Sequence, residues 1–367
     1  MIYLPLQHLQ PGMVLARSVY YHPTSLPLIV AGQQLIPEMI RKLTDLNISG
    51  VYIESKFTSD IEVKEFIEPK VKQQVTRDLK SLYSSYIRNV PLSSNTIDSM
   101  RNIAEELLNY ITSKEEFLLN IIDIKDYDTY TYSHSIYVGT LSVLIGMQLN
   151  YSKNLLLHLA MAGLFHDIGK LDIPLEIINK EGPLTSEEFE EIKTHPKKAI
   201  SRLEFSQKIP NIVLSAIESH HEKYNGTGYP HGLQGNNIPI YGRILALADV
   251  YDALTSARSY RRAWLPNEAV EYMMGCGGTH FDHDLLKAFL KIIAAYPVGT
   301  IVQLSNGSLA VVLQTSQENI LRPKIRLLTP KALENTDIDL ATDRSFFNVT
   351  ITGTVTDVDK LPNAIFE

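Results

Sequence analysis

Residues 160–170 read AMAGLFHDIGK, an apolar run that ends in a histidine, an aspartate and a lysine. The run Ala160–Phe165 predicts a buried helix with His166 and Asp167 at its end. Burying these two polar groups is costly unless something compensates them. A metal ion would do so, because imidazole and carboxylate are good ligands for iron, manganese and zinc. A hydrogen-bonded pair in the core is the alternative interpretation of these two residues taken alone.

Other histidines and aspartates interrupt the apolar stretches around this run. The candidate metal ligands are His134, His166, Asp167, His195, His220, His221 and Asp249. Inward-facing ligands from separate helices are how helical bundles build metal sites. Asp252 follows Asp249 by three residues and is a candidate to hold a ligand in position. Lys170 follows His166 by four residues, so on a continuing helix it shares that face and could meet an anionic substrate.

Two polar stretches follow these candidate ligands. The loop Tyr224–Pro230 contains Gly226 and Gly228, which allow tight turns and close approach to a ligand. An ordinary surface loop is the alternative. Further on, Arg258 and Arg261 could grip phosphate groups through two parallel hydrogen bonds. A solvated charge run is the alternative for the arginines.

Composition excludes several classes of protein. The chain has 367 residues, of which 44% are hydrophobic and 20% charged, so it is not globally disordered. Its net charge of −7 argues against binding nucleic-acid polymers or anionic membranes non-specifically. Cys276 is the single cysteine, which excludes an intramolecular disulfide and a multi-cysteine zinc site. With no long apolar run and no basic leader at the start, we expect no membrane insertion and a cytoplasmic location.

Hydrophobic periodicity predicts a mainly α protein with small β-rich modules at both ends. Residues 116–296 read as helical nearly throughout and include every candidate site residue. The predicted helices in this range include 129–149, 152–167, 185–204 and 239–258. The stretch 59–115 predicts two helices, either a connecting hairpin or a dimerisation stalk. The predicted domains are 1–58 (β-rich accessory module), 59–115 (helical linker or stalk), 116–296 (helical catalytic domain) and 297–367 (small β domain).

The order and spacing of these motifs resemble the HD-GYP subgroup of the HD-domain phosphohydrolases. The matching segments are YTYSHS at 130–135, HDIGKLDIP at 166–174, His195, HHEKYNGTGYP at 220–230, DVYDALT at 249–255, Arg258 and Arg261. The resemblance covers about half of the chain, and such an ordered set is far more specific than a lone His-Asp pair. It implies an HD-type helical bundle.

The resemblance implies a metal-dependent hydrolase that cuts a phosphodiester bond of a cyclic dinucleotide. Cyclic di-GMP is the first expected substrate, with pGpG and further GMP as products. The seven candidate ligands would hold two divalent metal ions, Fe or Mn, with Asp167 as the bridge and Lys170 beside the scissile phosphate. Two such metals can neutralise charge, supply a nucleophile and stabilise the leaving group. The implied substrate contacts are Lys170, Tyr224, Gly228, Tyr229, Pro230, Arg258 and Arg261.

One departure from the family concerns metal number. Some members have a glutamate four residues before the first ligand histidine, where it helps to bind a third metal. This chain has Tyr130 there, and a neutral phenol is a poor ligand for a hard cation. We therefore expect two metals rather than three.

Two other functions stay open. One is hydrolysis of hybrid cyclic GMP-AMP or of another phosphoester. The other is a receptor that binds the nucleotide and signals through the accessory modules. The complete ligand set favours an enzyme, because binding alone would not require seven ligands. A homodimer and a signalling partner protein stay open as further partners.

Overall fold

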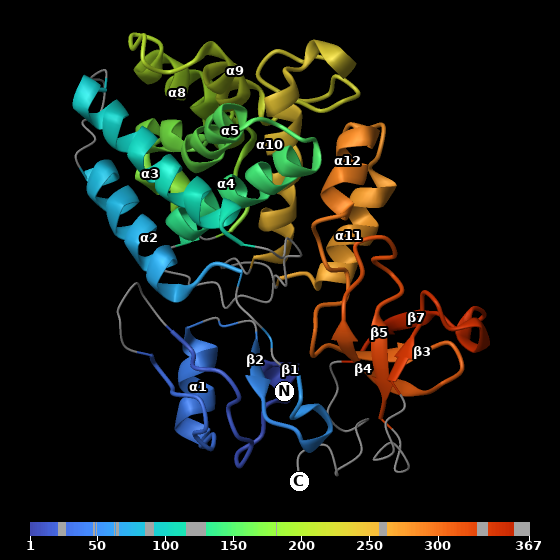
Figure 1. Cartoon of the computed structure of the whole chain (residues 1–367). Helices are drawn as coiled ribbons and strands as arrows, with labels where there is room; N and C mark the ends of the chain where they lie inside the picture. The colour runs from blue at the N-terminus through green and yellow to red at the C-terminus, as the bar shows by residue number, and fades with distance from the viewer. Residues whose placement is uncertain are drawn as a thin grey trace.

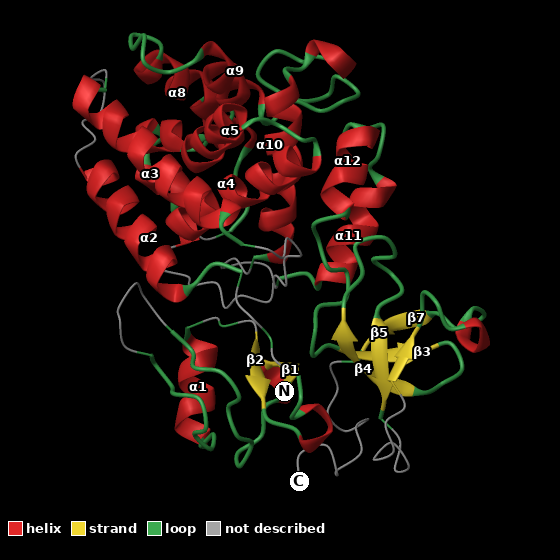
Figure 2. Ribbon diagram, in the orientation of Figure 1, coloured by secondary structure: helices red, strands yellow, loops and turns green. Residues whose placement is uncertain are grey.

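The computed structural model describes most of the chain. The exceptions are residues 21–26, 47, 49, 62, 64–65, 85–91, 115–129, 181, 257–262, 329–336 and 356–367. Most helices fill one part of the molecule, and the strands gather in the other together with the first helix (Figures 1 and 2). The predicted fold class, mainly α with small β-rich modules, is confirmed. None of the described helices is both long and apolar enough to cross a membrane.

The helices follow the predicted periodicity closely. They are α1 (Pro37–Asp45), α2 (Pro69–Ser84), α3 (Ser94–Thr112), α4 (Tyr130–Gln148), α5 (Lys153–Phe165), α6 (Leu175–Ile178), α7 (Ser186–Ile192), α8 (His195–Leu203), α9 (Asn211–Ser219), α10 (Ile240–Thr255), α11 (Pro266–Gly275) and α12 (His283–Leu290). Between α5 and α6 the chain forms a short 3-10 turn, η3 (Ile168–Asp172).

One predicted helix, 185–204, is wrong as a single element because it is two helices, α7 and α8. Pro196 has no N–H to donate to Ile192, so a continuous helix would lose that bond. The chain instead turns at Lys193 and Thr194. This break places His195 at the first position of α8, where its side chain points into the interior.

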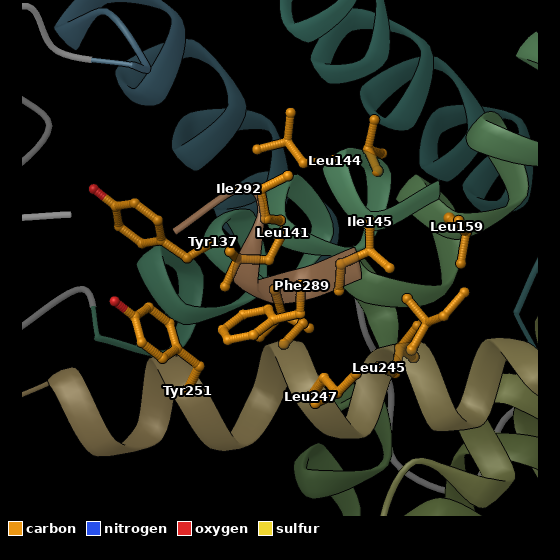
Figure 3. Packing of buried hydrophobic residues seen from close by; sticks show 14 of the residues in the cluster. Tyr137, Leu141, Leu144, Ile145, Leu159, Leu245, Leu247, Tyr251, Phe289 and Ile292 are labelled. Atoms are coloured by element: carbon orange, nitrogen blue, oxygen red, sulfur yellow. The ribbon is translucent and has the colours of Figure 1, made fainter. Parts of the chain in front are cut away.

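Helices α4 and α5 lie at the centre of the helical part. They approach closely at two glycines: a Cβ on Gly163 would lie 2.5 Å from the Cα of Gly139. Buried side chains of α4, α10 and α12 pack against one another (Figure 3). Among them, the ring of Tyr251 meets that of Phe289 edge to face, with centroids 5.1 Å apart. Helices α2 and α3 belong to the same core, since Leu79 and Leu107 are buried in it.

The strands form two antiparallel sheets. A two-stranded sheet pairs β1 (Ile2–Pro5) with β2 (Gly50–Ile53). The second sheet has the order β6-β5-β4-β3-β7 and consists of β3 (Ile301–Leu304), β4 (Leu309–Gln314), β5 (Lys324–Leu327), β6 (Asp337–Asp339) and β7 (Ile351–Thr354). The stretch Leu28–Val30 has residues typical of a strand, but Ile29 makes only an isolated bridge with Val19.

The two ends of the chain share a core. Buried Ile2, Leu4 and Val51 from the N-terminal sheet cluster with Ile301 and Val311 from the C-terminal sheet.

An ion pair reinforces this junction at its edge. The Arg326 guanidinium donates to both carboxylate oxygens of Asp60 at 2.7 and 2.9 Å, and also to Asp337 on the neighbouring strand at 2.7 Å. Such two-pronged pairs fix geometry as well as charge.

Candidate metal centre

Five elements bring the predicted ligands together. His134 comes from α4, His166 and Asp167 directly follow α5, His195 begins α8, and His220 directly follows α9. Asp249 lies on α10 and His221 directly follows His220. Helix ends expose backbone carbonyls, which makes them good places to orient a histidine.

Each of four histidines is oriented through its Nδ1 atom. The partners are Asp252 for His134 at 2.8 Å, the Gly163 carbonyl for His166 at 2.8 Å, the Ile192 carbonyl for His195 at 2.7 Å and the Ile217 carbonyl for His220 at 2.6 Å. Nδ1 must donate to these acceptors. Nε2 is then the atom available as a metal ligand, the arrangement found around metal-bound histidines.

The Nε2 atoms converge in two groups around Asp167. In the first group, the Nε2 atoms of His134 and His166 are 3.2 Å apart and lie 3.6 and 3.3 Å from Oδ2 of Asp167. In the second, the Nε2 atoms of His195 and His220 are 3.3 Å apart and lie 3.3 and 3.9 Å from Oδ1. One carboxylate therefore faces both groups.

Asp249 and His221 complete these groups. Oδ1 of Asp249 lies 3.3 Å from Nε2 of His134, and Oδ2 lies 3.7 Å from Nδ1 of His221. Candidate ligand atoms of Asp167, His195, His220 and His221 all lie within 4.8 Å of one another.

The carboxylates of Asp167, Asp249 and Asp252 dominate the electrostatics of the cluster. Burial alone would lower the pKa of His134, but its bonds to Asp249 and Asp252 outweigh burial and raise that pKa to about 9. Burial alone would raise the pKa of Asp167, but the charges of His166 and Lys170 outweigh it and hold that pKa well below its usual range. Burial lowers the pKa of His221 to about 3, so this side chain is neutral at pH 7.

The donor set fits divalent metal ions. Oδ1 of Asp167 is buried and accepts no hydrogen bond from any part of the chain that the structure describes. It faces Nε2 atoms whose rings already donate through Nδ1. A buried carboxylate oxygen without a donor is costly in a dry interior, and a cation between it and the imidazoles would satisfy it. Imidazole and carboxylate without thiolate suit iron and manganese at least as well as zinc.

Lys170 and Tyr229 border the cluster. Nζ of Lys170 lies 2.6 Å from Oδ2 of Asp167. Helix α5 does not continue to Lys170, which lies in the 3-10 turn η3 instead. The ring of Tyr229 stacks on that of His221 with centroids 4.7 Å apart. Burial and the charges of Asp249 and Asp167 raise the pKa of Tyr229, so its phenol stays protonated.

The loop that bears Tyr229 is held by a residue that we had not singled out. Glu222 is 2% exposed, and its carboxylate accepts the backbone N–H groups of His231 at 2.7 Å and Leu233 at 3.0 Å. Gly228 packs so tightly that a Cβ there would lie 2.5 Å from the Cα of Glu222. The sequence held a signal for this role: an acidic residue between a ligand pair and a glycine-rich loop.

Some predicted residues are placed and others are not. Tyr224 donates its N–H to the His280 carbonyl at 3.0 Å, and Pro230 follows a cis peptide bond in the same loop. Arg258 and Arg261 lie outside the described residues, as does the side chain of Tyr130. Their predicted roles therefore stay predictions.

A bundle in which a His-Asp pair meets histidines from neighbouring helices defines an HD-type metal-binding domain. The HD domain family matches residues 116–285, and the family described as "KOW domain associated with HD domain" matches residues 301–353. The chain belongs to the HD-domain family, in its HD-GYP group. This confirms the resemblance inferred from the motifs.

Three curated relatives illustrate the similarity. A cyclic di-GMP phosphodiesterase of Thermotoga maritima is 33% identical over 278 residues, which cover 70% of this chain and 74% of that protein. One of Pseudomonas aeruginosa is 36% identical over 226 residues, covering 62% and 54%. A 3'3'-cGAMP-specific phosphodiesterase of Vibrio cholerae is 31% identical over 267 residues, covering 71% and 48%. The chain thus spans about half the length of the latter two.

A solved structure agrees on the fold. The HDG"Y"P protein of Bdellovibrio bacteriovorus superposes with a TM-score of 0.51 at 17% identity. The match covers 78% of this chain and 97% of that protein.

Proposed function

We propose that this protein is a metal-dependent phosphodiesterase that hydrolyses a cyclic dinucleotide, with cyclic di-GMP as the first substrate. The observation that supports this most is the placement of Asp167, whose two oxygens face two separate groups of imidazole Nε2 atoms. Relatives of this chain are named cyclic di-GMP phosphodiesterases. The products would be pGpG and, after a second cut, GMP.

The centre would hold two divalent ions, Fe or Mn. His134, His166, Asp167 and Asp249 would hold one, and Asp167, His195, His220 and His221 the other. When bound, such a metal pair neutralises phosphate charge and lowers the pKa of water enough to make it a nucleophile. By accepting from Nδ1, Asp252 would leave Nε2 as the atom of His134 that gives up its proton to the metal.

Residues of the chain itself would bind and orient the substrate. Lys170 is about one-third exposed, so its ammonium can reach a phosphate oxygen while it stays next to Asp167. The protonated phenol of Tyr229 can donate a hydrogen bond but cannot act as a base near pH 7. The backbone at Gly228 allows close approach beside them. Arg258 and Arg261 are proposed to hold guanine or phosphate groups.

A second candidate substrate is cyclic GMP-AMP. It is favoured by the similarity to 3'3'-cGAMP-specific phosphodiesterases of Vibrio cholerae, one of which is 37% identical over 172 residues. We further propose a cytoplasmic location, where cyclic dinucleotides act. A homodimer and a signalling partner remain proposals of the same kind, and nucleic-acid polymers are not expected as partners at a net charge of −7.

The test is turnover by the protein purified anaerobically and loaded with Fe(II) or Mn(II). Cyclic di-GMP, 3'3'-cGAMP and cyclic di-AMP are compared by chromatography of the products. We expect linear dinucleotide from cyclic di-GMP, and no product from His166→Ala or Asp167→Ala. A ligand that binds tightly but is never cut would favour the receptor instead.

A further inference from the structure

A lysine outside the predicted site lies between two aromatic rings beside the metal centre. Nζ of Lys193 is 4.8 Å from the ring centroid of Phe189 and 5.9 Å from that of Tyr229. Both distances allow a cation–π contact. Tyr229 in turn stacks on His221, so Lys193 lies one ring away from a candidate metal ligand.

The position of this lysine is fixed by the break between α7 and α8. Lys193 N–H donates to the Phe189 carbonyl at 3.0 Å, while the preceding carbonyl, that of Ile192, accepts from Nδ1 of His195. The same turn therefore orients His195 inward and Lys193 toward Tyr229. Lys193 itself makes no described contact with a candidate ligand.

The existing partner of Lys193 leaves it free to bind an anion. Its ammonium pairs with Glu190 at 2.6 Å, and the Glu190 side chain is 68% exposed. Exposed pairs of this kind contribute little to stability, so exchange for a phosphate costs little. Phe189 is 45% exposed, so part of its ring is accessible for stacking on a nucleobase.

We propose that Lys193 and Phe189 form a second substrate-contact region, for the half of the cyclic dinucleotide that is not being cut. Lys193 contacts the non-scissile phosphate, and Phe189 stacks on the attached base. Proteins that bind single-stranded nucleic acid combine a cation, which contacts a phosphate, with an aromatic ring, which stacks on the base. This inference rests on the proposed function, because it concerns the same substrate.

The experiment compares a substrate that has a second nucleotide with one that has none. KM and kcat are measured for cyclic di-GMP and for bis(p-nitrophenyl) phosphate with wild type, Lys193→Gln, Phe189→Leu and Lys197→Gln. Lys197→Gln is the matched control. Lys197 is exposed, and its substitution removes the same charge three residues beyond the turn. Metal content is determined for each protein.

We expect Lys193→Gln to raise KM for cyclic di-GMP about tenfold, the effect of losing one charged contact. Phe189→Leu should raise it about fivefold or more, through lost stacking. KM for bis(p-nitrophenyl) phosphate should change less than threefold in both, and metal content should stay at the wild-type level. Lys197→Gln should change neither KM.

Three outcomes would overturn the inference. An unchanged KM for cyclic di-GMP in Lys193→Gln would show that the lysine does not contact substrate. An equal loss for both substrates, or a fall in metal content, would make Lys193 a structural support of His195. If Lys197→Gln raises KM for cyclic di-GMP as much as Lys193→Gln does, the rise comes from the change in net charge and not from a contact of Lys193. If wild type cuts no cyclic dinucleotide at all, the proposed function fails, which is a separate result.

Discussion

Gly169 and His195 touch through their backbones. A Cβ on Gly169 would lie 2.0 Å from the carbonyl oxygen of His195 and 2.6 Å from the amide nitrogen of Ala199. Because Gly169 has no side chain, the backbone of η3 packs directly against the first turn of α8. This contact sets the 3.3 Å separation between Oδ1 of Asp167 and Nε2 of His195.

Gly169→Ala should therefore push α8 away from Asp167. We expect a loss of about 1–3 kcal/mol in the free energy of unfolding, the usual cost of overpacking, and less metal bound per chain. Urea unfolding and elemental analysis measure the two effects. Gly275→Ala is the control, since a Cβ there meets nothing within 4 Å and should leave both quantities near wild type. Wild-type metal content in Gly169→Ala would contradict the argument.

Asp252 should affect metal affinity without touching the metal. Its Oδ2 lies 2.8 Å from Nδ1 of His134 and also accepts from Oγ of Ser256 at 3.2 Å. Asp252→Ala removes the acceptor that orients His134, and we expect metal affinity to fall about 10- to 100-fold. Asp252→Asn keeps an acceptor oxygen, so its metal affinity should fall clearly less than that of Asp252→Ala. Competition with a chelator of known affinity measures both, and equal losses in the two variants would contradict the positioning role.

Glu222 should control the loop rather than the metal. Glu222→Gln replaces one acceptor oxygen by a donor, which leaves either the His231 or the Leu233 N–H unpaired in a buried place. Such a loss costs about 1–3 kcal/mol, so we expect faster proteolysis within 224–235 and a higher KM at unchanged metal content. The control is Glu218→Gln, because Glu218 pairs with His231 from the same side but is about one-third exposed. If both variants behave alike, the two backbone bonds of Glu222 are not what holds the loop.

The Asp60–Arg326 pair predicts a pH dependence at the junction of the two chain ends. The hydrogen bond from Arg326 lowers the pKa of Asp60 below its ordinary value of 3.8. A lowered pKa in the folded protein stabilises it above the unfolded value, and this contribution is lost as pH falls through the folded pKa. Because Asp60 is 60% exposed, the contribution is small, about 1 kcal/mol or less.

Asp60→Asn should accordingly lower the midpoint of thermal unfolding slightly at pH 7. The difference from wild type should hold down to about pH 4 and shrink below it. Asp98→Asn removes a carboxylate of comparable exposure, 52%, which pairs with Lys208, and serves as the control. A difference that grows as the pH falls would contradict the sign of the shift.

The helical part and its cluster could be predicted from the sequence because both are periodic and local. The helical spacing of apolar residues located α4, α5 and α10 within three residues of their observed bounds. Adjacent pairs such as His166-Asp167 indicated ligands at helix ends. The break at Lys193 was missed because the apolar pattern runs through it, and only the missing N–H of Pro196 opposes a continuous helix.

Long-range contacts could not be predicted in this way. Nothing local in β1 or β6 indicates a strand, since each is only three or four residues long and depends on a partner elsewhere in the chain. The joint core of the two ends pairs residues some 300 positions apart, such as Ile2 and Ile301. The hydrogen bonds that Glu222 accepts likewise come from backbone N–H groups nine and eleven residues further along the chain.

The joint core also fixes an order of events during synthesis. The N-terminal sheet leaves the ribosome before the helical bundle, yet Ile2, Leu4 and Val51 meet Ile301 and Val311 only after that bundle has been translated. At about 5–20 residues per second, this core stays open for many seconds on the side that Ile301 and Val311 later cover. This core is therefore completed only when the C-terminal sheet emerges, and it is during this interval that a chaperone would protect the N-terminal segment.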